Sequence, residues 1–260
     1  LDLGLVADRV YYSKYHLHRM FTGTVGMTPH DYVRRRRLTE AARLLADSRR
    51  PILEIALEAG YESQQAFAGV FRTMYKRTPL EYRKKECFYP LQLPLLLYPE
   101  PPAPGRADFQ VRYALEEDIP DWMDFVPQVI DGFPCYDEAE HRRRLQGYVK
   151  RRQALIVRDR ELLVGAAACS RQSGRIDFLG VHPQYRRYGV GEALLAFLQR
   201  TLSGVQRISI TTYRKGDRAD TGQRAYYQRL GFTEAELLTE YGYPTQRLIL
   251  KSGQEGTDHE

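Results

Sequence analysis

The sequence predicts a multidomain protein in which an all-α first third is followed by an α+β domain. Residues 1–86 repeat themselves at an offset of 50, which is the mark of one supersecondary unit used twice. Later residues alternate between strand-like and helix-like patterns, with a buried strand, a glycine-bearing turn and an amphipathic helix at 176–201. At 260 residues the chain can bury two cores. We expect a first domain at 1–86, a proline-rich linker at 87–107, a second domain at 108–251 and a polar tail at 252–260.

Each copy of the repeat reads as a helix, a short turn and a second helix. Tyr11, Ser13, Phe21, Thr28-Pro29 and Tyr32 recur as Tyr61, Ser63, Phe71, Thr78-Pro79 and Tyr82. The serines are the predicted N-caps, and Gly60 provides a tight turn. The predicted buried stripes are Leu17, Met20 and Phe21 in one copy and Phe67, Val70 and Phe71 in the other. Between the copies, residues 29–47 form one predicted helix of roughly 28 Å with proline at its first position.

The positive charge is concentrated in this first third. Residues 1–86 hold 16 Lys and Arg against 10 Asp and Glu, whereas residues 87–260 hold 23 of each. Such a skew indicates an anionic polymer as the partner, and long donors at a helix N-terminus suit base reading in the major groove. For each side chain the alternative is a solvated helix face. The predicted DNA-reading residues are Lys14, Tyr15, His18, Arg19, Gln64, Gln65 and Arg72.

This duplicated unit resembles the two helix-turn-helix motifs of the AraC/XylS family over nearly all of residues 1–86. The resemblance implies double-stranded DNA as a partner and RNA polymerase as a further candidate. By position, Tyr15, His18 and Arg19 would read one half-site, and Gln64 and Gln65 the other. Gly69 stands where relatives carry a second groove-reading arginine. The family's first helix lies upstream of Leu3, and the chain begins at Leu1, so we expect that helix to be missing. Arg34 to Arg37 surround the connecting helix, so one or two would anchor a phosphate strand and the rest would be solvated.

A second motif predicts an anion site. An apolar strand at 176–181 stops at His182-Pro183 and leads through Arg186, Gly189 and Gly191 into the helix at 192–201. Backbone N–H groups and the positive helix end converge at such a turn, which predicts a ligand that carries phosphate. The alternative is a plain surface turn. A dinucleotide-binding fold would need a third glycine and an acidic residue about 20 residues on, and neither fits.

This motif resembles the acyl-CoA loop of the GNAT acetyltransferases, and the likeness covers about residues 108–251. The resemblance implies a mixed, mostly antiparallel sheet. It also implies that acetyl-CoA binds, either as the acyl donor or as a ligand. We expect strands at 109–115, 154–158, 162–170, 205–213, 232–240 and 246–251, with helices at 116–131, 136–152 and 223–230. The implied cofactor-binding residues are Leu179, Val181, Arg186, Arg187, Tyr188, Gly189, Val190 and Gly191.

The same resemblance suggests catalytic roles. Tyr227 opens a Tyr-x-x-x-Gly-Phe segment whose tyrosine often protonates the departing thiolate, a reasonable task for a phenol with a pKa of about 10. The alternative is a core tyrosine. Asp177 is the first candidate base and His182 the second, although Asp177 could equally be a solubilising residue. Asp220 stands near where many relatives carry asparagine. The acceptor-pocket candidates, each with core packing as the alternative, are Trp122, Phe133, Tyr136 and His141.

These observations favour a transcription regulator whose second domain binds acetyl-CoA and transfers the acetyl group to an amine, either a small amine or a protein lysine. The alternative is a non-catalytic acyl-CoA or small-ligand sensor that modulates DNA binding, and two uncoupled domains are a third option. Three widely spaced cysteines indicate a reducing compartment and no structural zinc. The most apolar stretch, 91–98, is too short to span a membrane, and no signal peptide is visible, so we expect a cytoplasmic location.

Overall fold

The structure is a computed structural model, and it describes residues 2–85, 87–98, 109–129, 137–202, 205 and 207–251. The chain divides into two compact units. Unit 1 comprises Leu1–Pro101 with Val126–Glu138 and Gly216–Gly222, and unit 2 comprises Pro102–Phe125, Ala139–Lys215 and Gln223–Glu260. The predicted polar tail, residues 99–107 of the linker and the pocket candidates Phe133 and Tyr136 lie outside the described residues. No described helix combines the length and hydropathy that crossing a membrane requires.

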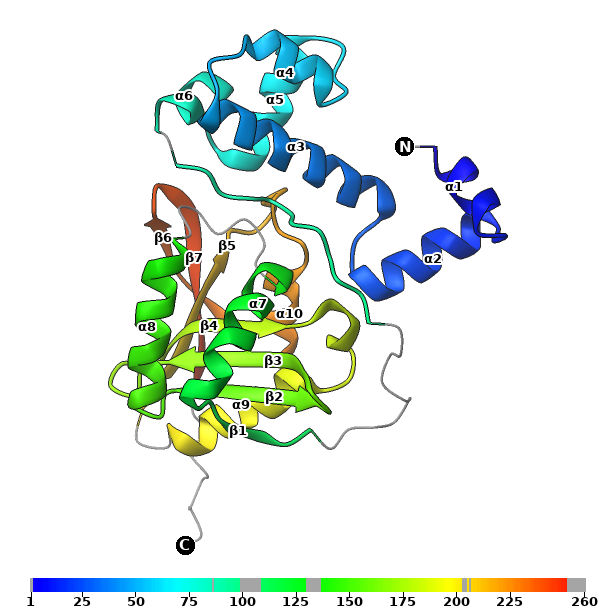
Figure 1. The fold of residues 1–260 in the computed structure, drawn as a ribbon. Helices are drawn as coiled ribbons and strands as arrows, with labels where there is room; N and C mark the ends of the chain where they lie inside the picture. Colours follow the sequence, from blue (N-terminus) through cyan, green and yellow to red (C-terminus); the bar gives the residue numbers. More distant parts are fainter. Residues whose placement is uncertain are drawn as a thin grey trace, which may run out of the picture. The chain divides into compact units, whose positions relative to one another are not determined.

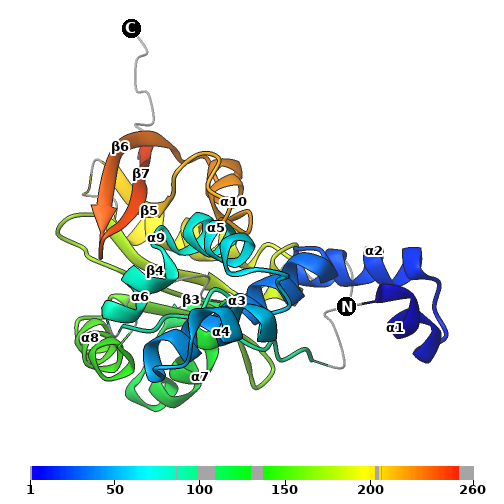
Figure 2. The ribbon, with the colours of Figure 1, turned by 90° about the horizontal axis from the view of Figure 1, so that it is seen from above.

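Unit 1 is helical and is organised around its longest helix (Figure 1). Its helices are α1 (Leu3–Arg9), α2 (Lys14–Val25), α3 (Pro29–Asp47), α4 (Ile52–Glu58), α5 (Gln64–Tyr75) and α6 (Pro79–Lys84). Helices α1 and α2 lie at one end of α3, and α4 to α6 lie at the other (Figures 1 and 2). The predicted N-caps are confirmed: Ser13 Oγ accepts from the His16 N–H at 3.1 Å, and Ser63 Oγ accepts from the Ala66 N–H at 3.2 Å.

The two copies of the repeat are packed unequally. In α5, Phe67 and Phe71 are buried and belong to a cluster of stacked and edge-on rings. In α2, by contrast, only Val25 is buried, and Met20 is 40% exposed. The predicted buried stripe on α2 is therefore wrong for Met20. The physical reason is that α1 has only seven residues and a single buried one, so it offers little apolar surface to cover its neighbour.

The segment that follows α6 packs on α3 within unit 1. The N–H groups of Leu91 and Gln92 both donate to Thr39 Oγ1 on α3, at 3.0 and 3.1 Å. Leu91 is buried. The connecting helix also differs from the expectation of solvated arginines, because Arg36 donates to the Gln92 carbonyl oxygen at 2.9 Å and Arg34 pairs with Asp31. The Arg36 guanidinium therefore connects the segment to α3, whereas the Arg34 pair lies within the helix.

Unit 2 is built on a seven-stranded sheet in the order β1-β2-β3-β4-β5-β7-β6. The strands are β1 (Val111–Tyr113), β2 (Ala154–Asp159), β3 (Leu162–Cys169), β4 (Arg175–Val181), β5 (Arg207–Tyr213), β6 (Thr233–Glu240) and β7 (Tyr243–Lys251). The helical elements are η1 (Glu116–Asp118), α7 (Ile119–Val129), α8 (Glu138–Lys150), η2 (Pro183–Tyr185), α9 (Val190–Thr201) and α10 (Gln223–Arg229). Every pair of neighbouring strands is antiparallel except β4 and β5, which confirms the predicted mixed, mostly antiparallel sheet. The first strand is shorter than expected.

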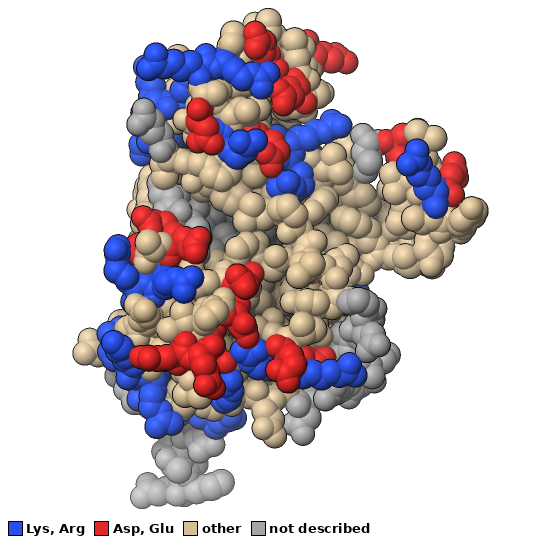
Figure 3. Space-filling model, viewed as in Figure 1, with Lys and Arg blue, Asp and Glu red and all other residues tan. Residues whose placement is uncertain are grey.

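Helices cover both faces of this sheet. A Cβ at Gly165 in β3 would collide with Val190 of α9, so one face packs directly on α9. On the opposite face, Phe178 of β4 contacts Trp122 of α7 and His141 of α8. Acidic and basic side chains lie next to each other on the surface of unit 2 (Figure 3), and on α8 Glu140 accepts from Arg143 and Arg144. The candidate residues on β4 therefore lie between α9 on one face and α7 and α8 on the other.

Candidate functional site

The turn that follows β4 forms an open cradle of backbone donors. Gly189 caps α9 with a φ of 81°, in the left-handed region that glycine tolerates. Among the described residues, no acceptor is found for the N–H groups of Arg187, Gly189, Val190, Gly191 and Glu192. A Cβ placed at Gly189 would meet no atom within 4 Å. Five free donors at the positive end of a 12-residue helix, with open space beside them, fit an anionic group such as a phosphate.

Gly191 serves a different purpose. A Cβ there would collide with the Tyr226 hydroxyl, so only glycine lets α10 place this ring against the start of α9. Burial, followed by the charge of Glu192, raises the pKa of Tyr226 above its ordinary value. The hydroxyl therefore stays protonated at neutral pH and is available as a donor beside the cradle. The sequence analysis did not single out Tyr226.

The other predicted cofactor residues surround the cradle. Leu179 and Val181 are buried in β4, so a ligand would reach them through the backbone rather than through their side chains. Arg186 is half-buried, and its Nε donates to the Val181 carbonyl oxygen at 3.5 Å. Arg187 is exposed and Tyr188 is half-buried. The cradle thus has two guanidinium groups next to its N–H groups.

Strands β4 and β5 separate just where the candidate base lies. They pair only at Arg175 with Ser209 and at Ile176 with Ile210. Asp177 comes next and is the extra residue of a β-bulge, because Ala168 pairs with Phe178 while Cys169 pairs with Ile176. A bulge re-aims side chains, and here it turns Asp177 and Phe178 toward the face that carries α7 and α8.

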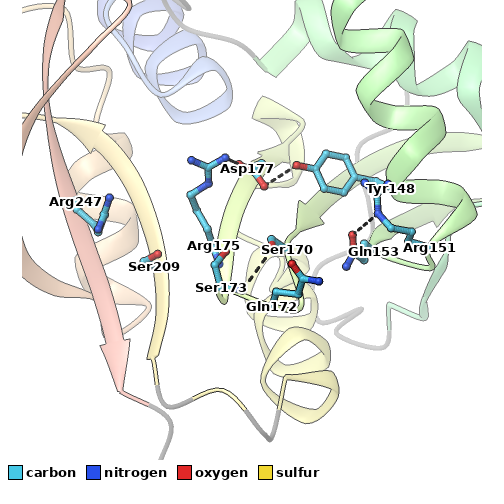
Figure 4. A pocket seen from close by; sticks show the side chains of 10 residues that line it. All are labelled: Tyr148, Arg151, Gln153, Ser170, Gln172, Ser173, Arg175, Asp177, Ser209 and Arg247. Atoms are coloured by element: carbon cyan, nitrogen blue, oxygen red, sulfur yellow. Dashed lines mark hydrogen bonds and ion pairs between the residues drawn. The ribbon is translucent and has the colours of Figure 1, made fainter.

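The Asp177 carboxylate is held by two partners (Figure 4). Tyr148 of α8 donates from Oη at 2.6 Å, and Arg175 forms an ion pair at 2.5 Å. Burial and the neighbouring carboxylate raise the pKa of Tyr148, so its hydroxyl remains a donor. The Asp177 side chain is 18% exposed, which leaves it accessible from one side.

The other two catalytic candidates are more enclosed. His182 is completely buried, and its Nδ1 accepts from the Gln184 N–H at 3.4 Å. Tyr227 is 4% exposed, its Oη donates to Gln223 Oε1 at 3.3 Å, and its ring packs on Phe232. Of the three, Asp177 is the least enclosed, and it lines a cavity.

That cavity has a volume of about 680 Å³ and lies beside β4, β5 and β7 (Figure 4). It is lined by Tyr148, Arg151, Gln153, Ser170, Gln172, Ser173, Arg175, Asp177, Ser209 and Arg247. Trp122 and His141, proposed from the sequence as pocket residues, instead pack against Phe178. Burial, followed by the charge of Arg144, lowers the pKa of His141 to about 4. In the described part of the chain, no group of three or more His, Cys, Asp or Glu side chains could hold a metal ion.

The predicted DNA-reading residues all reach the surface of unit 1. Lys14, Tyr15, His18 and Arg19 are exposed on α2, and Gln64, Gln65 and Arg72 are exposed on α5. The Arg19 guanidinium lies 5.5 Å from the centre of the Tyr15 ring. Neither Lys14 nor Arg19 has an acidic partner among the described residues, so both can meet phosphate or base edges.

Comparison with known proteins identifies both parts. Residues 6–85 match a helix-turn-helix domain family. Over 85 residues the chain is 46% identical to the regulatory protein SoxS of Escherichia coli, which covers 33% of this chain and 79% of SoxS. The chain belongs to the AraC family. It is also 43% identical over 84 residues to the right origin-binding protein of Escherichia coli, covering 32% of this chain and 29% of that protein.

The remainder of this AraC-family chain carries a second domain. Residues 150–234 match the acetyltransferase (GNAT) domain family, so the chain combines an AraC-type domain with a GNAT domain. The solved structure of yncA from Salmonella typhimurium, determined with acetyl-CoA, is 14% identical with a TM-score of 0.43. The match covers 58% of this chain and 98% of yncA.

Several side chains of the GNAT domain gain importance only from the structure. Tyr148, Arg175 and Arg247 come from α8, β4 and β7, yet they line one cavity with Asp177. No sequence motif connects them. An alternation argument could have placed Arg175 and Asp177 on one side of their strand, but it could not have placed Tyr148 beside them.

Proposed function

We propose that this protein is a DNA-binding regulator of the AraC family whose GNAT domain binds acetyl-CoA and transfers the acetyl group to an amine. The observation that carries the acetyl-CoA part is the cradle of five free N–H groups at the start of α9. A pyrophosphate is the anionic part of such a ligand, and Arg186 and Arg187 add positive charge beside it. The open space next to Gly189 admits it without displacing a side chain.

The separation of β4 and β5 supports a site for the rest of the acetyl-CoA molecule. Beyond Ile176 and Ile210, β4 and β5 no longer pair, so the facing edge of β4 can offer backbone groups to an extended amide-containing arm. Acetyl-CoA, when bound, supplies a thioester that an amine can attack. The chain's own groups hold and move the protons of that attack.

Asp177 is the proposed base. Its carboxylate lies at the point where the strands separate and faces the cavity. The hydrogen bond from Tyr148 and the ion pair with Arg175 orient it, and it can take a proton from an approaching ammonium group. Tyr227 is the proposed acid, because it holds a proton on Oη that it can give to a leaving thiolate. His182 is completely buried and so is less suited to proton transfer.

A steady-state thiol-release assay with acetyl-CoA and a panel of amines tests this proposal. Tyr227→Phe removes one hydroxyl and keeps the ring packing on Phe232. Turnover should fall by about 10²–10⁴-fold, with acetyl-CoA affinity unchanged. Tyr82→Phe, which removes a buried hydroxyl from unit 1, is the matched control and should leave turnover unchanged. Full activity in Tyr227→Phe would remove this residue from the reaction.

A second candidate function is supported by the burial of Tyr227 and His182. At 4% and 0% exposure, neither side chain presents a clear path for proton exchange. Such a site could bind acetyl-CoA as a signal without turning it over. In that case calorimetry would detect binding of acetyl-CoA, whereas no amine in the panel would release thiol above the hydrolysis background.

A further inference from the structure

The cavity beside Asp177 is polar on every side. None of its ten lining residues is aliphatic, and five are serine or glutamine, of which Ser170, Gln172 and Ser173 lie in the loop between β3 and β4. Three lining residues are arginines and one is an aspartate, so the lining carries two excess positive charges (3 − 1). A cavity with this lining favours a polar, anionic occupant over an apolar or cationic one.

The cavity reaches the proposed reaction centre. Arg175 and Ser209 form the strand pair that lies next to the separation of β4 and β5, and Asp177 is the bulged residue just past the second pair. Figure 4 shows Arg247 and Ser209 on one side of the hollow, Tyr148 and its neighbours on the other, and Asp177 between them. One small molecule in this space can therefore contact the Asp177 carboxylate and an arginine on one side of it.

We infer that the acceptor is a small amine that also carries an anionic group, either carboxylate or phosphate. Its ammonium group lies at Asp177, and its anionic group lies at an arginine of the lining that does not pair with Asp177, either Arg247 on one side of the cavity or Arg151 on the other. This inference rests on the proposed acetyl transfer. In that transfer the ammonium group gives one proton to Asp177, and the free amine nitrogen bonds to the acetyl carbonyl carbon while the C–S bond breaks. Tyr227 gives a proton to the leaving sulfur, and the second proton that the nitrogen loses restores the Tyr227 hydroxyl.

The arginines are available for such a ligand. Arg247 pairs with Glu236 at 2.7 Å, but the two side chains are 36% and 55% exposed, and exposed ion pairs are weak and easily exchanged. The Arg151 Nε donates only to the neutral amide oxygen of Gln153 at 3.0 Å, so its charge is not neutralised there. Arginine also suits carboxylate and phosphate because its planar fork donates two parallel hydrogen bonds.

Matched pairs of acceptors test the inference on the full chain. Phosphoethanolamine and ethanolamine differ only in the phosphate, and β-alanine and β-alaninamide differ in the ionised carboxylate, whereas putrescine and spermidine represent cationic acceptors. In the thiol-release assay, kcat/KM should be about 10- to 100-fold higher for the anionic member of each pair. Arg247→Gln should raise KM about tenfold for the members that carry the anionic group and leave KM unchanged for the members that lack it. Arg200→Gln is the control, because it removes an exposed arginine from α9 on the opposite face.

The outcomes separate the two proposals. Equal kcat/KM within each pair, or a preference for putrescine and spermidine, would overturn the acceptor class while leaving acetyl transfer standing. An anionic preference that survives both Arg247→Gln and Arg151→Gln would show that another surface recognises the anion. Release from no amine at all would overturn the proposed transfer and the acceptor class together.

Discussion

The conformation of Gly189 gives the sharpest test of the acyl-CoA cradle. An alanine at this position must adopt a φ near 81°, which costs an L-residue about 1–2 kcal/mol. Because no atom lies within 4 Å of the new Cβ, no steric clash adds to this cost. At about 2–4 °C for each kcal/mol, the melting temperature of unit 2 should fall by roughly 2–8 °C. The domain should therefore stay folded at room temperature.

The effect of Gly189→Ala on ligand affinity should be larger than its effect on stability. The new methyl group would occupy the open space beside the free N–H groups of the cradle, where the phosphate is proposed to lie. Losing two charge-assisted hydrogen bonds costs about 3 kcal/mol or more, because each contributes about 1.5–3 kcal/mol. The dissociation constant of acetyl-CoA should therefore rise at least about 100-fold. Isothermal titration at 25 °C measures this change directly.

Gly216→Ala is the matched control for strain. Gly216 also has a positive φ, 77°, and a Cβ there would also meet no atom within 4 Å. Because Gly216 belongs to unit 1, its substitution should lower the melting temperature of that unit by a similar amount without weakening acetyl-CoA binding. If Gly189→Ala bound acetyl-CoA as tightly as the wild type while showing the expected loss of stability, the phosphate would not lie at this turn.

Two further predictions concern DNA recognition and acid stability. Arg19→Ala should weaken binding to a selected duplex by about 1–3 kcal/mol, and Gln64→Ala should cost less because α5 has Gly69 in place of a second arginine. Fluorescence anisotropy at one salt concentration measures both, and equal losses would contradict unequal half-sites. The pKa of His141 is about 4 in the fold against 6.5 ordinarily, so the unfolded chain binds its proton first as the pH falls. Unfolding in urea should show that unit 2 loses about 2 kcal/mol of stability between pH 7.5 and pH 5. His141→Gln should remove that loss, whereas His30→Gln, at an exposed position, should leave it unchanged. A wild-type stability that does not change with pH would refute this assignment.

Local signals in the sequence were sufficient to predict the helices and strands and the anion-binding turn between β4 and α9. The cap serines and the proline that starts α3 act within a few residues of themselves, so their positions could be predicted. The same holds for the strand, turn and helix from β4 to α9. The predicted helix began two residues late, because Val190 and Gly191 already belong to α9.

Burial and side-chain neighbours were harder to predict, because they depend on residues that are distant in the chain. The exposure of Met20 follows from the shortness of α1 rather than from the pattern of α2 itself. The bulge at Asp177 arises from the register between β3 and β4, which no local propensity encodes. Tyr148 and Arg247 reach the cavity from elements that lie 29 and 70 residues from Asp177 in the sequence, as the numbering shows.

The two glycines of the loop are required for different physical reasons, although a motif treats them alike. Gly189 is fixed by its own backbone, since a left-handed φ excludes most side chains, and the space beside it is free for a ligand. Gly191 has no such backbone constraint and is instead fixed by the Tyr226 hydroxyl, which occupies the place of a side chain. The tyrosine that touches the cradle is therefore Tyr226, while its neighbour Tyr227 turns toward Phe232. Because adjacent residues of a helix point in different directions, two consecutive tyrosines of α10 can have different roles. Tyr226 lies against the anion cradle, and Tyr227 is the proposed proton donor.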